Sequence, residues 1–420
     1  MNPFAAALLV ISCVLILSLS SRNAPIPFII ATCYLTMGQT IMLGPLHFTP
    51  LRVLIAVGLL RIILRGERPQ GSIKSLDGTI ILWGLWLILA SFFHKDPKAT
   101  FINHSGIVFD VLGSYILFRS FIVSVDECKR IIKILAFILL PVAVEMAIEQ
   151  FNHYNFFSIF GGVAQSPAIR HGRVRSQGPF RHAILAGTVG AVCIPLMIGI
   201  WKQHRKAAKV GVFACSLMVL ASASSGPLAS LLISFFALLL WRWRHLTKEM
   251  RIAVITSYVL LEIVMKAPAY YIIARIDLAG GSTGWHRARL IEMAIKHLNE
   301  WWIAGTDYTR HWMPTGVSWS PNHIDITNEY IQMGVLGGLP STILFIWILW
   351  TAFCYLGEML KRSYKVSMET AWFLWCIGCS LLANVATMIS VSYFDQSYLF
   401  LYLVIAMVGS LHGWIKEVYC

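Results

Sequence analysis

Long apolar runs separated by short polar segments make up most of this chain. The runs extend over roughly 17 to 22 residues, enough at 1.5 Å per residue for a helix to cross the hydrocarbon core of a bilayer. The pattern predicts an all-α polytopic membrane protein with about 12 or 13 transmembrane helices. The expected spans are 4–20, 26–44, 50–64, 78–94, 106–123, 131–149, 183–201, 210–225, 227–241, 252–267, 338–357, 370–392 and 396–415.

Two polar segments, 150–182 and 266–337, are much longer than the other connections. They divide the chain into a transmembrane bundle (1–265) with a smaller loop, a large loop (266–337) and C-terminal transmembrane helices (338–420). Apolar residues recur at intervals of three and four from Trp285 to Trp302, which predicts an amphipathic helix in the large loop.

The composition supports a membrane protein over a soluble one. With 57% hydrophobic and 13% charged residues, the chain is too apolar for a soluble globule. Its first apolar run lacks a basic segment before it and a small-residue cleavage site after it, so we expect a spanning helix there and not a signal peptide. No nucleotide-binding loop or H-E-x-x-H motif is present, and the sequence predicts neither a cofactor nor a metal.

The net charge of +14 is concentrated in short loops. If the spans alternate in direction, most of these loops fall on one side, which the positive-inside rule makes cytoplasmic. The two long segments then face the periplasm of a bacterium. We therefore expect a multi-pass protein of the inner membrane that contacts lipid and does not bind nucleic acid.

The smaller outer loop contains a basic cluster with no carboxylate among its members. Guanidinium groups stay charged and donate two parallel hydrogen bonds to phosphate, so the cluster predicts an anionic partner. Lipid head-group phosphates are the alternative to a specific substrate. The cluster consists of Arg170, His171, Arg173, Arg175, Arg181 and His182.

The large loop adds further candidates. Arg287 and Arg289 lie in the first turns of the predicted amphipathic helix, and His323 precedes the next membrane entry. A histidine is a natural proton acceptor because its pKa lies near neutrality. Three histidines of the same loop compete for this role: His286, His297 and His311.

Some charges fall within the apolar runs, where an unpaired charge costs at least about 2–3 kcal/mol. We expect Asp110 either to pair with an arginine of another helix, such as Arg52, or to line a polar cleft for an acceptor. Glu145, near the outer end of its helix, is a candidate for contact with a sugar.

Three motifs resemble the O-antigen ligase and polymerase superfamily of polytopic inner-membrane glycosyltransferases. Arg175 is followed by Gly178 and Phe180, as in the family's first arginine motif, and Arg287 is followed by Ala294 and Gly305. The third motif is a histidine before a glycine-flanked helix entry, here His323 with Gly334 and Gly337. Where the family often has asparagine or serine after the histidine and a glutamate near the glycine, this chain has Ile324 and Gln332; Glu329 is the alternative carboxylate.

The resemblance implies a metal-independent, inverting glycosyltransferase without a cofactor. Its donor would be a glycan on undecaprenyl diphosphate, and its acceptor either lipid A-core, in a ligase, or a second lipid-linked glycan, in a polymerase. Arg175, Arg287 and His323 would be catalytic. Substrate-binding candidates are Arg289, Arg173, Arg181, His182, Glu329 and Glu145.

A transporter or flippase for lipid-linked saccharides is the rival interpretation. Such proteins place ionisable groups at mid-membrane and are built from repeated halves. Here no internal repeat is evident and the polar residues gather in the outer loops, so the enzyme is favoured.

Overall fold

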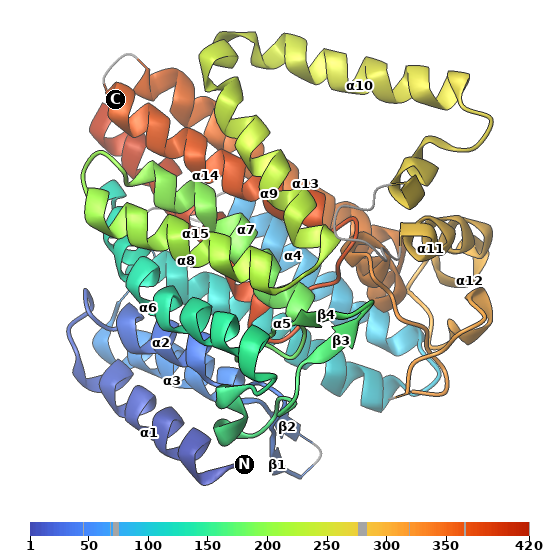
Figure 1. Cartoon of the computed structure of the whole chain (residues 1–420), viewed down its shortest axis with the longest axis horizontal. Coiled ribbons are helices and arrows are strands. Elements are labelled where there is room, and N and C mark those ends of the chain that lie inside the picture. Colours follow the sequence, from blue (N-terminus) through green and yellow to red (C-terminus); the bar gives the residue numbers. More distant parts are fainter. Residues whose placement is uncertain are drawn as a thin grey trace.

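The computed structural model describes residues 1–44, 46–67, 69, 75–275, 284–318, 320–364 and 367–419. The chain is 74% helical with almost no sheet, which confirms the all-α prediction. The helices are α1 (Pro3–Ser18), α2 (Pro25–Tyr34), α3 (Pro50–Arg65), α4 (Ser75–Ala90), α5 (Pro97–Phe121), α6 (Val125–Asn152), α7 (Ala183–Gly199), α8 (Arg205–Ala221), α9 (Ser225–Leu239), α10 (Thr247–Val264), α11 (Gly284–Lys296), α12 (Leu298–Trp301), α13 (Glu329–Ser363), α14 (Met368–Thr387) and α15 (Ser397–Tyr419). Figure 1 shows most of the helices in one bundle, with α10, α11 and α12 at its side.

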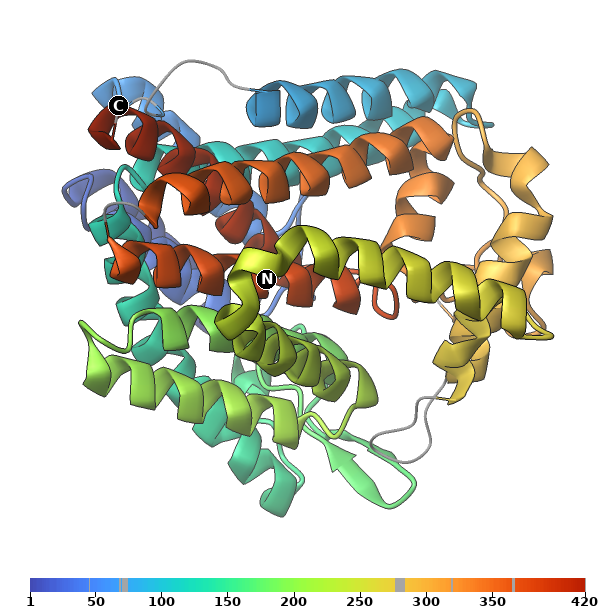
Figure 2. The ribbon, with the colours of Figure 1, turned by 90° about the horizontal axis from the view of Figure 1, so that it is seen from above.

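Short elements connect these helices. The 3₁₀ turns are η1 (Ser91–Phe93), η2 (Phe156–Phe160), η3 (Leu240–Leu246), η4 (Ala269–Arg275) and η5 (Arg310–Trp312). Two antiparallel hairpins pair β1 (Ile41–Leu43) with β2 (Leu46–Phe48) and β3 (Ala168–Arg170) with β4 (Arg173–Arg175). Figure 2 shows the β3–β4 hairpin and α11 toward one end of the bundle and the C-terminus at the other.

Each of the predicted spans overlaps a helix, but the lengths differ in both directions: α2 and α14 are shorter than predicted, whereas α5, α6 and α13 are longer. Among the described residues, seven helices are long and apolar enough to cross a membrane, or eight if the bent pair Thr256–Val264 and Ala269–Arg275 counts as one span. Three shorter apolar helices, α1, α2 and α7, add to them. The chain is thus a multi-pass membrane protein. Fewer of its described helices are long and apolar enough to span a membrane than the 12 or 13 that were predicted. The run 26–44 shows why: α2 ends at Tyr34, and β1 occupies the far end of the run.

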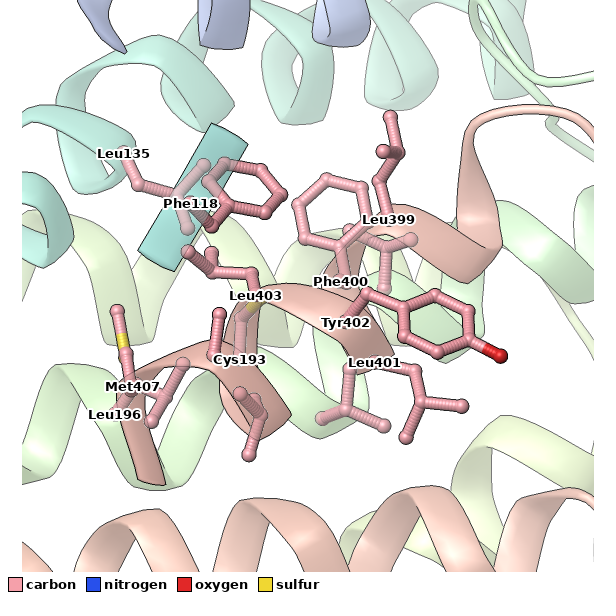
Figure 3. Close-up of a cluster of buried hydrophobic side chains, with 14 of the residues drawn as sticks. Phe118, Leu135, Cys193, Leu196, Leu399, Phe400, Leu401, Tyr402, Leu403 and Met407 are labelled. Atoms are coloured by element: carbon pink, nitrogen blue, oxygen red, sulfur yellow. The ribbon is translucent and has the colours of Figure 1, made fainter. Parts of the chain in front are cut away.

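Helix α15 forms the centre of the bundle. In its most apolar stretch, 89% of the residues are buried inside the protein, the largest share among the candidate spans. Figure 3 shows Phe400 and Leu403 of α15 among Phe118 of α5, Leu135 of α6 and Cys193 of α7. By contrast, α10 lies along the outside (Figure 1), and its apolar side chains from Tyr258 to Val264 are mostly exposed, as expected for a surface that faces lipid.

Several charged side chains inside the helices are paired. Arg52 binds Asp110 with two nitrogens, at 3.0 Å from Nε to Oδ1 and 2.9 Å from Nη2 to Oδ2, which confirms the predicted pair. Arg61 is fully buried, pairs with Glu67 at 2.7 Å, and donates to the Leu19 carbonyl, just beyond α1, at 2.7 Å. Such pairs satisfy charges that would otherwise be costly in an apolar interior.

The large loop is hydrogen-bonded to α13 at a break in that helix. The helix changes direction at Gly337 and Gly338, and Gly338 has a φ of +75°. On either side of the break, Thr306 N donates to Val335 O and Leu339 N donates to Trp302 O, both at 2.9 Å. A Cβ on Gly338 would lie 2.2 Å from the Ile303 carbonyl oxygen, so only glycine fits.

We predict that Gly338→Ala destabilises the protein by at least about 1–3 kcal/mol, because the left-handed backbone and the close carbonyl both oppose a side chain. Denaturant unfolding of the purified protein in lipid or detergent measures the loss. Gly357→Ala is the matched control in the same helix, where a Cβ would meet no atom within 4 Å, and is expected to be neutral or stabilising by up to about 1 kcal/mol. Equal stabilities of the two variants would contradict the proposed fit.

Candidate functional site

Arg175 ends β4 and is held against the bundle. Its Nη2 donates to Ser224 Oγ at 2.9 Å, and the next residue, Ser176, donates its N–H to Ala221 O at 3.1 Å. Gln150 of α6 donates to Val174 O at 3.0 Å. These bonds fix the hairpin to the α8–α9 junction. The Arg175 Nε is buried and has no hydrogen-bond partner within the described part of the chain.

Two glutamates of α6 lie beneath the turn that follows β4. Glu149 Oε2 accepts from the backbone N–H groups of Gln177 and Gly178, each at 3.0 Å. Glu145 Oε1 accepts from Phe156 N at 2.8 Å. Among the residues described, the second oxygen of each carboxylate is buried without a hydrogen-bond partner. Glu145, predicted to contact a sugar, therefore retains one acceptor atom close to the arginine-bearing turn.

Arg287 brings the large loop to the same place. It lies in the first turn of α11 with only 8% of its surface exposed, and its Nε is buried without a hydrogen-bond partner among the described residues. Desolvation and then the charges of Arg170 and Arg175 lower the pKa of Arg287, while Asp325 acts in the opposite direction. Three guanidinium groups from two distant segments thus lie within electrostatic range. We call Arg170, Arg175 and Arg287 the arginine cluster.

His182 borders this cluster. Its Nδ1 accepts from Ile184 N at 3.2 Å and so caps the start of α7. Desolvation, followed by the charges of Arg175 and Arg170, lowers the pKa of His182 to about 4. At neutral pH the ring is therefore uncharged, and it adds a polar edge to the cluster without adding a fourth charge.

The structure places His323 beside a different set of groups. It is half-buried, with Nδ1 3.5 Å from Thr309 Oγ1. Desolvation lowers the pKa of His323, and the charge of Asp307 partly offsets this. Asp307 is thus one charge that acts on His323. Asp325, two positions further along the same loop, has a charge that acts on Arg287.

The other predicted residues have partners of their own. Arg289 Nη1 pairs with Glu292 Oε2 at 2.6 Å, and Arg181 pairs with Asp395 at 3.5 Å. Glu329 is buried, and its Oε2 accepts from Tyr393 N at 2.8 Å. Arg173 is exposed on the β3–β4 hairpin. The structure therefore brings Arg175 and Arg287 together and leaves Arg289 engaged elsewhere on α11.

The connection between α14 and α15 also lies at the candidate site, beside the smaller loop and the large loop. It was not predicted from the sequence. Its Gln396 donates to Pro179 O at 3.2 Å, and its Asp395 pairs with Arg181, so it contacts the arginine-bearing loop twice. The Gln396 Oε1 and Tyr398 hydroxyl oxygens are buried, with no hydrogen-bond partner among the residues described. The available signal was the polar pair Asp395-Gln396 between two long apolar runs.

No protein-family model and no curated protein matches this chain at a significant level. The functional interpretation accordingly rests on the arginine cluster, His323 and the loops that hold them.

Proposed function

We propose that this protein is a membrane glycosyltransferase, O-antigen ligase-like, that moves a glycan from undecaprenyl diphosphate to an acceptor hydroxyl at the periplasmic face. The observation that carries the proposal is the convergence of Arg170, Arg175 and Arg287. Arg175 and Arg287 are buried and each has an Nε donor without a partner among the described residues, which is costly unless an anion binds there. A diphosphate supplies the charge and the acceptor oxygens that the cluster lacks.

The proposed chemistry assigns a role to each of these residues. The bond between the anomeric carbon and the diphosphate oxygen breaks, and its electron pair passes to the diphosphate. Arg175 and Arg287 stabilise the negative charge that grows there. The acceptor oxygen attacks the anomeric carbon from the opposite face, which inverts the configuration.

His323 would accept the proton of the attacking hydroxyl. Its lowered pKa keeps the ring neutral near pH 7, the form that accepts a proton. In the tautomer whose Nδ1 donates to Thr309 Oγ1, Nε2 would be the atom that accepts the proton. No step of this mechanism requires a nucleotide or a metal.

The acceptor distinguishes the two versions of the proposal. A ligase transfers the glycan to lipid A-core, whereas an O-antigen or exopolysaccharide polymerase transfers it to a second lipid-linked glycan. Glu145, close to the arginine-bearing turn, is the proposed contact for a sugar hydroxyl.

The test is transfer by the purified protein in lipid, with a defined undecaprenyl-diphosphate glycan and either lipid A-core or a second copy of the donor. Glycosylated lipid A-core identifies a ligase, and a lengthened donor identifies a polymerase. If the donor binds or crosses the bilayer while neither acceptor is modified, the enzyme proposal is wrong and transport replaces it.

A further inference from the structure

A second group of ligand-type side chains lies at the far end of α11. His297, Glu300 and His311 place one ligand atom each within 4.8 Å of the others. His297 Nδ1 is 2.6 Å from Glu300 Oε1, and His311 Nε2 is 2.9 Å from Glu300 Oε2. Two imidazoles and a carboxylate are a common ligand set for zinc and related divalent transition metals.

The surrounding residues hold these ligands in place. Buried Trp312 donates its Nε1–H to Glu300 Oε2 at 3.2 Å. The His297 ring stacks on Trp312 with an interplanar angle of 14°, and the His311 ring stacks on Tyr308 with an angle of 8°. Ring stacking and an orienting hydrogen bond to the carboxylate are the supports that metal ligands typically receive from their neighbours.

We propose that His297 Nδ1, Glu300 and His311 Nε2 bind one divalent transition metal ion of the Zn²⁺ class, with water as the fourth ligand. Zinc binds nitrogen and oxygen ligands at about 2.0–2.1 Å, so the edges of its tetrahedron are about 3.3 Å long. The present distances from the two histidine nitrogens to the Glu300 oxygens, 2.6 and 2.9 Å, are somewhat shorter, because these side chains hydrogen-bond to one another. A small rotation of the rings opens the space for an ion.

The ion would act as a clamp and not as a catalyst. His297 follows Arg287 by ten positions, roughly 15 Å along a helix, so the metal lies away from the arginine cluster. It would join α12 to the segment that carries His311 and Thr309. Thr309 Oγ1 contacts His323 Nδ1 and accepts from Ile324 N at 3.2 Å. The clamp would therefore fix the support of the His323 loop, independently of the proposed glycan transfer.

The experiment uses the full-length protein in lipid nanodiscs, freed of metal with a chelator and titrated with Zn²⁺. We expect one equivalent to bind, with a rise in the thermal unfolding midpoint. Glu300→Gln keeps a side chain of the same shape and is expected to weaken Zn²⁺ binding by at least about tenfold, as is His311→Gln. His47→Gln, at an exposed histidine of β2, is the matched control and should bind as the wild type does.

Bound Co²⁺ provides a second measurement, because its visible spectrum reports nitrogen and oxygen ligation directly in the wild type, without the use of a variant. Saturable binding in the wild type that both ligand variants lose supports the site. Absence of stoichiometric binding, or binding that both variants retain at wild-type affinity, overturns it. Glycan transfer does not enter either readout, so failure here leaves the proposed function untouched.

Discussion

Arg287→Ala is expected to slow glycan transfer by about 10²–10³-fold, the usual loss when one preorganised donor to a developing negative charge is removed. The side chain is buried beside two other guanidinium groups, and its Nε has no hydrogen-bond partner in the described chain. Its removal is therefore expected to relieve charge repulsion in the protein without substrate. It is also expected to weaken binding of the diphosphate. The transfer assay and a thermal unfolding measurement on the same preparation test both effects.

The control for this prediction lies two positions away. Arg289 pairs with Glu292 on the same helix, so Arg289→Ala removes the same charge and is expected to retain the transfer rate within a few fold. Arg287→Lys should lose most activity, because lysine cannot donate the bidentate pair. Wild-type transfer by Arg287→Ala contradicts the assignment. A large fall in its unfolding midpoint would instead assign Arg287 a structural role.

His323→Ala is expected to reduce transfer by about 10²–10⁴-fold, the range for loss of a general base. His286→Ala, at another histidine of the large loop, should have a much smaller effect, since its Nε2 contacts only the Asp325 carbonyl at 3.3 Å among the described residues. If the two variants lost transfer activity equally, the assignment of His323 as the general base would be contradicted.

The pH profile gives a second test of His323. Because desolvation lowers the pKa of His323 below the ordinary value of 6.5, the basic form persists as the pH falls through 6.5, and the rate should decline only at more acidic pH. The unfolded chain takes up this proton at higher pH than the folded chain. The free energy of unfolding therefore decreases as the pH falls below 6.5. A transfer rate that halves above pH 6.5 would contradict this prediction.

The sequence predicted the positions of the helices better than their lengths. Apolar runs located α5 and α6 because burial in lipid or protein favours the same residues. They could not show that α2 stops at Tyr34, because tertiary contacts and not hydropathy decide whether an apolar run continues as a helix. Arg175 stood out in a basic segment without carboxylates, and Arg287 stood out by its position in the first turns of a predicted amphipathic helix. Their convergence depends on the path of two loops, which no local period encodes.

Other features of the site were harder to predict from the sequence for the same reason. His297 and His311 were visible as isolated histidines, but the part played by Glu300 depends on the turn of the chain between α12 and η5. The Asp395-Gln396 connection is short, and short polar links between apolar runs are usually simple turns. His323 lies with Asp307 because the loop folds back there.

The positive charge of the arginine cluster also affects how fast the product is released. Breakage of the glycosidic bond adds a negative charge to the diphosphate, so the spent carrier carries more charge than the donor that entered. The three guanidinium groups would then hold the product more tightly than the substrate. In an enzyme of the proposed kind, departure of undecaprenyl diphosphate is expected to limit the steady-state rate, and the free carrier should be a strong competitive inhibitor.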